Sequence, residues 1–307
     1  MSATHRRALK RRDVHPGAVV DGRPLRPGVG TRLGRRAQGL LVSAGERAEA
    51  DLDRLIAAQP GPSRPNVMAV ISPKGGVGKT TLSFLIGSLL ASRAQTRVVI
   101  LDANPDYGTL AALAPDELRC ERSVADLLDD LDHVATATQL LTYLSRLPTG
   151  VHLLGARGDA EAIASLTPER YGELVAYLSI FYDLVVLDCG TGVGRPLARF
   201  AVERADQITL VSTPGWVTSS VVLAALDELR HERTNLVVNM SHLRPGRETK
   251  ALEERFRRER LRSPVIVPHD DQLAAMLDSA TYTLEALERP TRLAIKRAGL
   301  AAAERLV

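Results

Sequence analysis

A glycine-rich run over residues 72–81 combines the residue types that hold a triphosphate. It follows an aliphatic stretch of strand character at 67–72 and precedes a helical pattern at 79–93. Glycines let consecutive backbone N–H groups point at an anion, and the N-terminus of the next helix adds the positive end of its dipole. A lysine at the helix start reaches the β- and γ-phosphates, and the hydroxyl after it binds Mg²⁺. These features predict a phosphate-binding loop formed by Gly75, Gly76, Val77, Gly78, Lys79, Thr80 and Thr81.

Two aspartates at the ends of aliphatic runs predict a metal site beside this loop. Asp102 closes the run at 97–102, and Asp188 closes the run at 183–188. A carboxylate at the carboxyl end of such a strand can hold the water shell of a bound metal ion or lie near the ion itself. An aspartate ending a buried strand is weak evidence alone, but Asp188 follows the loop and Asp102 in the order a nucleotide site requires. We therefore predict Thr80, Asp102 and Asp188 as the metal-site residues.

The elements that must position these residues alternate along the chain. Short aliphatic runs of strand character lie at 67–72, 97–102, 151–155, 183–188, 207–212, 235–239 and 264–268. Helical patterns between most of them lie at 79–93, 168–180, 194–205, 217–231 and 247–261, and 127–144 resembles an extra helical pair. Continuous apolar strands separated by amphipathic helices predict an α/β fold: a doubly wound, mostly parallel sheet of about seven to eight strands flanked by helices. Ligands of such sheets bind at the carboxyl ends of the strands.

The N-terminal part of the chain differs from the rest in charge and composition. Residues 1–65 hold 13 Lys/Arg against 6 Asp/Glu, whereas the remainder holds 27 against 30. Residues 1–39 are rich in Arg, Gly and Pro, with few apolar positions, and are expected to be disordered. A capping-box spacing and an apolar face predict a short helix near 43–58, followed by a Pro-rich linker at 59–65. We therefore expect a basic N-terminal extension over 1–65 and one α/β domain over 66–307.

The same composition bears on the compartment. Two cysteines do not make a disulfide framework, and no stretch approaches the roughly 20 uninterrupted apolar residues that span a bilayer. The basic N-terminus has no apolar segment behind it, so a secretory signal is not expected. We expect a cytoplasmic protein, with nucleoid association if its basic segments meet DNA.

The loop departs from the general P-loop in a way that resembles one family. Pro73 stands where the general pattern has glycine, and Lys74 precedes the glycine pair, which gives the run Lys-Gly-Gly-Val-Gly-Lys-Thr-Thr. This run resembles the deviant Walker A motif of ParA/MinD ATPases, and the resemblance covers roughly residues 66–307. It implies ATP and Mg²⁺ as cofactors and a homodimer in which Lys74 reaches across to the partner's nucleotide. Without the resemblance, Lys74 would be interpreted as a solvated loop lysine.

The resemblance also assigns roles to residues beyond the loop. The family's first switch usually reads Asp-x-Asp-Pro, and this chain has Asn104 where the second aspartate would orient or activate the attacking water. Asparagine can position a water but cannot accept its proton, so we expect hydrolysis that is slow without a partner protein. The resemblance places Asn239 on adenine and the backbone of Pro268, His269 and Asp270 along the base. Both segments could instead be ordinary strand ends.

The residues also bear on which related class of protein this chain resembles and on whether it binds a membrane or DNA. Iron–sulfur carriers with this loop need paired thiolates, which Cys120 and Cys189 do not resemble in spacing. Leu293, Leu300 and Val307 share a helical face without a Trp or Phe anchor, which favours a helix that covers the domain over a C-terminal membrane helix. The basic stretch 244–262 and the N-terminal extension could bind DNA nonspecifically, although four interleaved glutamates also fit a solvated helix face.

The expected function is that of an ATP-dependent dimer that positions or segregates a cargo, either DNA or a protein complex. Segments such as 102–110, 239–246 and 267–274 look closest to actinobacterial MinD-like ATPases, some of which accompany specialised secretion systems. The alternatives are therefore an accessory regulatory ATPase of a secretion or cell-envelope machine, or a slow-hydrolysing module clamped by ATP.

Overall fold

The computed structural model describes residues 30–104, 109–156, 166–226, 229, 233–243, 247–257 and 263–306. The chain divides into two units, Met1–Ala44 and Gly45–Val307, and helix α1 (Gly30–Ala57) crosses the boundary between them. The second unit contains every strand described below. Most of the segment expected to be disordered and part of the basic stretch 244–262 lie outside the described residues.

One eight-stranded sheet organises the second unit, in the order β3-β4-β2-β5-β1-β6-β7-β8. Every neighbouring pair is parallel except β3 with β4, which is antiparallel. The strands are β1 (Asn66–Ser72), β2 (Val98–Ala103), β3 (Ser145–Arg146), β4 (His152–Leu154), β5 (Leu184–Thr191), β6 (Gln207–Ser212), β7 (Thr234–Ser241) and β8 (Val265–Pro268). The predicted fold class is confirmed, and all seven predicted strands are present. The two-residue β3 is an addition that the aliphatic pattern did not indicate.

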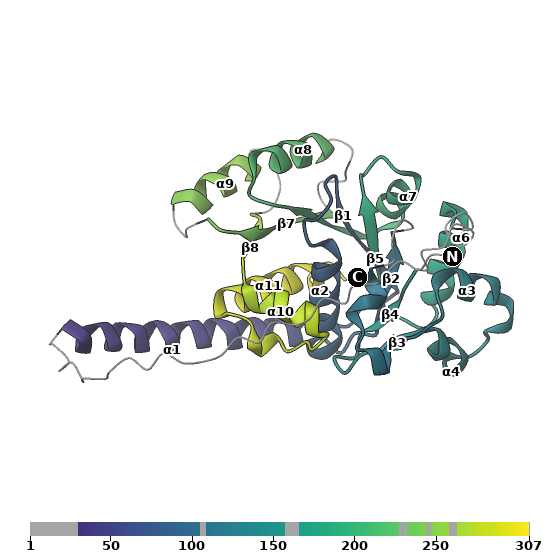
Figure 1. Cartoon of the computed structure of the whole chain (residues 1–307), viewed down its shortest axis with the longest axis horizontal. Coiled ribbons are helices and arrows are strands. Elements are labelled where there is room, and N and C mark those ends of the chain that lie inside the picture. Colours follow the sequence, from purple (N-terminus) through teal and green to yellow (C-terminus); the bar gives the residue numbers. More distant parts are fainter. Residues whose placement is uncertain are drawn as a thin grey trace, which may run out of the picture. The chain divides into compact units, whose positions relative to one another are not determined.

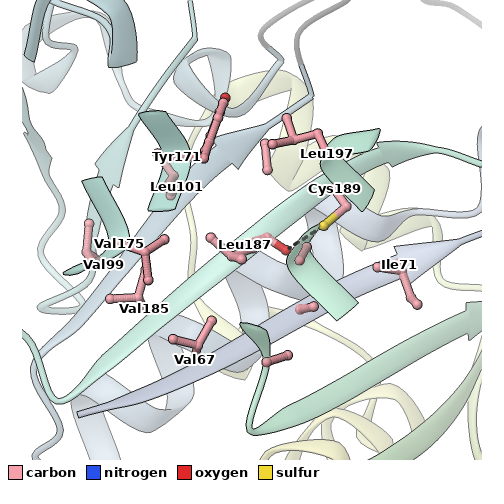
Figure 2. Close-up of a cluster of buried hydrophobic side chains, with 14 of the residues drawn as sticks. Val67, Ile71, Val99, Leu101, Tyr171, Val175, Val185, Leu187, Cys189 and Leu197 are labelled. Atoms are coloured by element: carbon pink, nitrogen blue, oxygen red, sulfur yellow. Dashed lines mark hydrogen bonds between the residues drawn. The ribbon is translucent and has the colours of Figure 1, made fainter. Parts of the chain in front are cut away.

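Side chains of the central strands alternate between two cores, as the period of two along a strand requires. In β1, Val67, Ala69 and Ile71 face one core, and Met68 and Val70 face the other. The first core is covered by residues of α3, α6, α7, α8 and α9, and the second by α2 and α11 (Figure 1). Figure 2 shows the first core, where Tyr171 and Val175 pack over β2 and β5. Both faces of the sheet are therefore buried, which explains why its strands read as continuous aliphatic runs.

The larger helices of the sheet domain coincide with the five predicted helical patterns and with the helix expected near the C-terminal end of the sequence, except for the helix that starts at Asp271, which was not predicted. They are α2 (Lys79–Arg93), α6 (Pro168–Leu178), α7 (Pro196–Arg204), α8 (Trp216–Leu226), α9 (Arg247–Arg257), α10 (Asp271–Ser279) and α11 (Arg289–Ala303). Proline at the first turn starts α6, α7 and α11, where its missing N–H costs nothing. Among the described residues, no helix is both long and apolar enough to cross a membrane.

The segment between β2 and β4 is built from short helical pieces. Two are α-helical, α3 (Val124–Asp129) and α4 (Ala137–Leu140), and each starts with a complete capping box, at Ser123 and Thr136. The others are 3₁₀ turns at Leu110–Leu113, Asp116–Leu118, Leu131–His133 and Leu141–Tyr143; a further turn lies at Leu284–Ala286 before α11. The extra helical pair predicted over 127–144 therefore corresponds to α3, α4 and the turns beside them.

Helix α1 is longer than the sequence pattern indicated. It begins at Gly30 and ends at Ala57, whereas the capping-box spacing predicts a start near residue 43. Residues 30–42 contain no proline, and their three arginines and three leucines favour helix, so the helix continues on the N-terminal side of Ser43 despite three glycines in the same stretch. The end of the helix, just before the Pro-rich linker, lies where it was predicted.

Candidate functional site

The glycine-rich loop joins the end of β1 to the start of α2 and turns through two left-handed residues. Gly76 has φ 71° and Gly78, the N-cap of α2, has φ 85°. A Cβ atom at Gly78 would lie 2.3 Å from Asn239 Nδ2. Only glycine fits this position, because the backbone conformation and the close neighbour both exclude a side chain. The loop therefore has the tight backbone that a phosphate cradle needs, at the N-terminus of a helix.

Lys79 stands at the first position of α2 in a partly buried environment. Loss of water lowers the pKa of its ammonium group, and the attraction of Asp188 and Cys189 opposes that effect. A cation that is partly desolvated and aimed along such a loop is stabilised by any anion that enters it. The loop and Lys79 therefore fit the polyphosphate of a nucleotide.

The two predicted metal-site aspartates lie side by side in the sheet. Asp102 on β2 is the register partner of Asp188 on β5, and both side chains are almost completely buried. Burial, followed by the mutual repulsion of the two carboxylates, raises the pKa of Asp102 to about 7, and burial raises that of Asp188 to about 6. A divalent cation beside them would favour the ionised forms. Hydroxyl and carboxylate oxygens are the ligands that Mg²⁺ prefers, so this pair and Thr80 fit that ion.

Hydrogen bonds connect Asp188 to the first turn of α2. The Thr80 hydroxyl donates to Asp188, which brings two predicted metal-site residues together. Ser83 Oγ also donates to Asp188 Oδ1 at 3.1 Å. Ser83 was not predicted, although its position three residues after Thr80 places it on the same face of the helix.

Asp102 is held by the backbone rather than by side chains. Its carboxylate accepts the N–H of Asn104 at 2.9 Å and that of Leu110 at 3.3 Å. Tyr171, another residue that the motifs did not indicate, donates its hydroxyl to the Asp102 carbonyl at 2.7 Å. The carboxylate of Asp102 thus holds the backbone of Asn104 and Leu110, which follow β2 in the chain.

Asn104, in the predicted first switch, lies against Gly190, which follows Asp188 on β5. A Cβ atom at Gly190, just after Asp188 and Cys189, would lie 2.7 Å from Asn104 Oδ1. The glycine therefore lets the amide of Asn104 approach the end of β5. The residues that follow Asn104, 105–108, lie outside the described part of the chain.

The second lysine of the loop has a different environment from Lys79. Lys74 is exposed, its backbone N–H donates to Ser72 Oγ at 3.2 Å, and its Nζ donates to Thr218 Oγ1 at 3.2 Å. Thr218 belongs to the first turns of α8 and is buried. Lys74 thus rests on its own chain, outside the cradle that Lys79 lines. Sequence reasoning did not indicate Thr218, because the contact joins residues 144 positions apart.

The predicted base-binding residues lie at the ends of β7 and β8. Asn239 Nδ2 donates to the Val77 carbonyl at 2.9 Å, so the residue predicted on adenine contacts the phosphate-binding loop. Pro268 is the register partner of Ser241 on β7. His269 packs on His242, with ring centroids 4.3 Å apart, and its Nε2 lies 3.0 Å from Asp271 Oδ1. The geometry places Asn239 beside the loop, whereas Pro268 and His269 contact residues at the end of β7.

The Asp270 carboxylate has a structural task. It caps α10 by accepting the N–H of Gln272 at 2.9 Å, and it accepts the N–H of Glu288 at the same distance. Of this residue, only the backbone remains for contact with a base, which is the contact the resemblance implied.

The two cysteines are separate in the fold. Cys189 is buried on β5, and Cys120 donates to the Thr142 carbonyl at 3.3 Å. Within the described ranges, no group of three or more His, Cys, Asp or Glu residues is arranged to hold a metal ion.

Comparisons with known proteins identify the family of this chain. The AAA domain family model matches residues 65–236, more than half of the chain. The ESX-1 secretion-associated protein EspI of Mycobacterium tuberculosis is 29% identical over 245 residues, covering 76% of this chain and 36% of EspI. The chain therefore spans about a third of that relative's length. Antiactivator FleN of Pseudomonas aeruginosa is 27% identical over 238 residues, covering 73% of this chain and 80% of FleN.

Solved structures share the fold. A ParA family ATPase from Chlorobium tepidum has a TM-score of 0.65 at 20% identity, covering 76% of this chain and 98% of that one. The septum site-determining protein MinD of Pyrococcus horikoshii, complexed with Mg-ADP, has a TM-score of 0.60 at 17% identity, covering 76% and 94%. With its deviant P-loop, its eight-stranded sheet and its match to the family model, the chain belongs to the AAA domain family and is a ParA/MinD-type P-loop ATPase.

Proposed function

We propose that this chain is an ATP-dependent dimerising ATPase whose nucleotide state switches its association and thereby positions a cargo. The observation that carries the proposal is the pair of lysines on one loop. Lys79 is partly buried at the N-terminus of α2, whereas Lys74 is exposed and its ammonium group donates to Thr218. Lys79 would bind the nucleotide of its own subunit. Lys74 would leave Thr218 and contact the nucleotide of a second subunit.

The residues of the loop would divide the work of binding. Backbone N–H groups of Gly75 to Gly78 would surround the phosphates, and Lys79 would neutralise the β- and γ-phosphates. Thr80 and Asp188, already joined by a hydrogen bond, would hold Mg²⁺, with Asp102 beside them. The ion would supply charge stabilisation on the phosphate oxygens.

Association would then depend on Lys74. A two-fold dimer presents the same loop from both subunits, so each Lys74 can reach the other's triphosphate. That move requires breaking the bond to Thr218 Oγ1, a contact of about 1 kcal/mol for an exposed cation. ATP would complete the interface, and hydrolysis would remove the phosphate that holds it.

Hydrolysis is expected to be slow without a partner protein. Asn104 lies against Gly190 near the end of β5, where its amide could hold the attacking water. Its amide can orient that water but cannot accept a proton, so catalysis depends on positioning and charge. A partner that orders this region would accelerate turnover.

Two kinds of cargo are supported by different observations. Helix α9 carries several arginines, of which Arg255 donates to Ser220 on α8, and a basic surface of this kind would bind DNA in a salt-dependent manner. The similarity to EspI, a secretion-associated protein, supports instead a regulatory ATPase of a secretion machine. Retention of duplex DNA that requires ATP and is lost with salt would favour the first; retention of secretion-machine components without DNA would favour the second.

The proposal is tested by comparing two substitutions in the same loop. Lys79→Ala should abolish binding of a fluorescent ATP analogue, because it removes the cation inside the cradle. Lys74→Ala should leave that binding within about twofold while abolishing turnover and association. Equal loss of nucleotide binding in both variants would contradict the division of roles.

A further inference from the structure

Two helices far apart in the sequence meet through faces of opposite charge. In α1 the acidic residues recur at spacings of three and four, which places them on one face of the helix. In α11 the basic residues recur at the same spacings, and ion pairs within the sheet-containing unit join the two rows. The acidic row is Glu46, Glu49 and Asp53, and the basic row is Arg289, Arg292 and Lys296.

The contacts between the rows are numerous and short. Lys296 Nζ lies 3.0 Å from Glu49 Oε1 and 2.8 Å from Asp53 Oδ2. Arg292 binds both carboxylate oxygens of Glu49, with Nε at 2.8 Å and Nη2 at 3.1 Å. Such two-pronged pairs are the strongest geometry for arginine and carboxylate. Glu49 is therefore the centre of the cluster.

The cluster is shielded from solvent, unlike most ion pairs between helices. The Lys296 side chain is 4% exposed and that of Glu49 is 15% exposed. The hydrogen bond from Arg292 lowers the pKa of Glu49 to about 2, so the carboxylate is ionised throughout the neutral range. Exposed ion pairs contribute little to stability, but removing one member of a shielded pair leaves a charge that water cannot compensate.

Apolar and steric contacts accompany the charges. Ile56, one turn beyond Asp53, is completely buried in the core formed by α2, α11 and the sheet. At the other end, a Cβ atom at Gly45 would lie 2.9 Å from Arg289 Cδ, so the helices approach closely there. The last part of α1 thus has an apolar anchor at one end and tight packing at the other.

The cluster extends to the helix that carries the phosphate-binding loop. Arg93, in the last turn of α2, lies 4.0 Å from Asp53 and 3.3 Å from Glu285. Because α2 begins at Lys79, its far end is connected to α1 through Asp53. Loss of α1 would leave Lys296 without both of its carboxylates and Arg93 without one.

From this geometry we infer that residues 45–57 are an acidic helix bound to α11 as a fixed intrachain partner, and that the ATPase body begins at Gly45. The division of the chain into units at Ala44 agrees with this boundary. The expected boundary at residue 66 would cut the cluster. The inference is independent of nucleotide binding, and it means that removal of the basic extension should stop before Gly45 if the ATPase body is to remain intact.

Hydrogen exchange of the full-length protein tests this binding. The amides of residues 47–57 should be protected in the unaltered chain. Lys296→Met and Glu49→Gln should each raise the exchange of these amides at least about tenfold. Protection should not be lost completely, because Glu49 keeps Arg292 and Arg289 in the first variant and Lys296 keeps Asp53 in the second. Asp51→Asn is the matched control, since Asp51 lies on the same helix, is 55% exposed and pairs with the exposed Arg54. It should change exchange less than about twofold.

A charge swap guards against variants that merely fold poorly. The double variant Glu49→Lys with Lys296→Glu should exchange more slowly over 47–57 than Glu49→Lys alone or Lys296→Glu alone. In the double variant, residues 49 and 296 again carry opposite charges. Unprotected amides over 47–57 in the unaltered chain would overturn the inference. The inference would also be overturned if the amides of 47–57 exchanged at the same rate in Lys296→Met as in Asp51→Asn. Nucleotide affinity, measured in parallel, reports on the proposed function separately.

Discussion

Substitution of the two left-handed loop glycines separates backbone strain from crowding. Gly76→Ala meets no atom within 4 Å but must hold φ 71°, which costs about 1–2 kcal/mol for a residue with a side chain. Gly78→Ala must hold φ 85° and also displace Asn239 Nδ2 from 2.3 Å. That displacement breaks the 2.9 Å bond from Asn239 to the Val77 carbonyl, which adds about 1–3 kcal/mol for buried polar groups left unpaired.

Urea denaturation in the absence of nucleotide measures how much the strain and the crowding lower the free energy of unfolding. We expect the free energy of unfolding to fall by about 1–2 kcal/mol in Gly76→Ala and by about 2–5 kcal/mol in Gly78→Ala. Gly61→Ala, where nothing lies within 4 Å and φ is not positive, is the control and should be near neutral. In the double variant Gly78→Ala with Asn239→Ala, the loss should be smaller than the sum of the single losses, since the crowding is removed. The reasoning is refuted if Gly78→Ala is no more destabilising than Gly76→Ala.

Three further predictions concern the site and the helix pair. Asn104→Asp should raise single-turnover ATP hydrolysis several-fold at pH 8, because a carboxylate can accept the proton of the attacking water; an unchanged rate would show that Asn104 does not face that water. Ser83→Ala should reduce the free energy of unfolding by about 1–3 kcal/mol, because Asp188 loses a buried donor, whereas Ser92→Ala on the same helix should be nearly neutral. The pKa of Glu49 is depressed to about 2, so its stabilisation is full above its ordinary value and is lost as the pH falls toward 2; the melting temperatures of wild type and Glu49→Gln should converge over that interval, and a constant difference would contradict it.

The sheet and the loop could be predicted from the sequence because their signals are local. The aliphatic runs coincide with β1, β2 and β4 to β8, since strands buried on both faces must be apolar at every position. The loop from Gly75 to Thr81 carries its own geometric requirement in its glycines. Asp102 and Asp188 were predicted by their place at strand ends, and the sheet places them as register partners.

The features that could not be predicted depend on contacts between distant segments. Strand β3 has two residues and no apolar pattern, so only its pairing with β4 defines it. The contact of Lys74 with Thr218 and the meeting of α1 with α11 join residues more than 140 positions apart. Charged residues on one helix face are normally solvated, so a sequence pattern gave no reason to expect that Glu49 is shielded.

The central claim is that a triphosphate joins two copies of the chain through Lys74. Sedimentation of the full-length protein with a slowly hydrolysed ATP analogue should give the mass of a dimer, and sedimentation with ADP should give a monomer. Lys74→Ala should bind the analogue and remain a monomer, whereas Thr218→Val, which frees Lys74, should dimerise at a several-fold lower protein concentration than wild type. A wild-type chain that binds the analogue and keeps the mass of a single subunit would contradict the account.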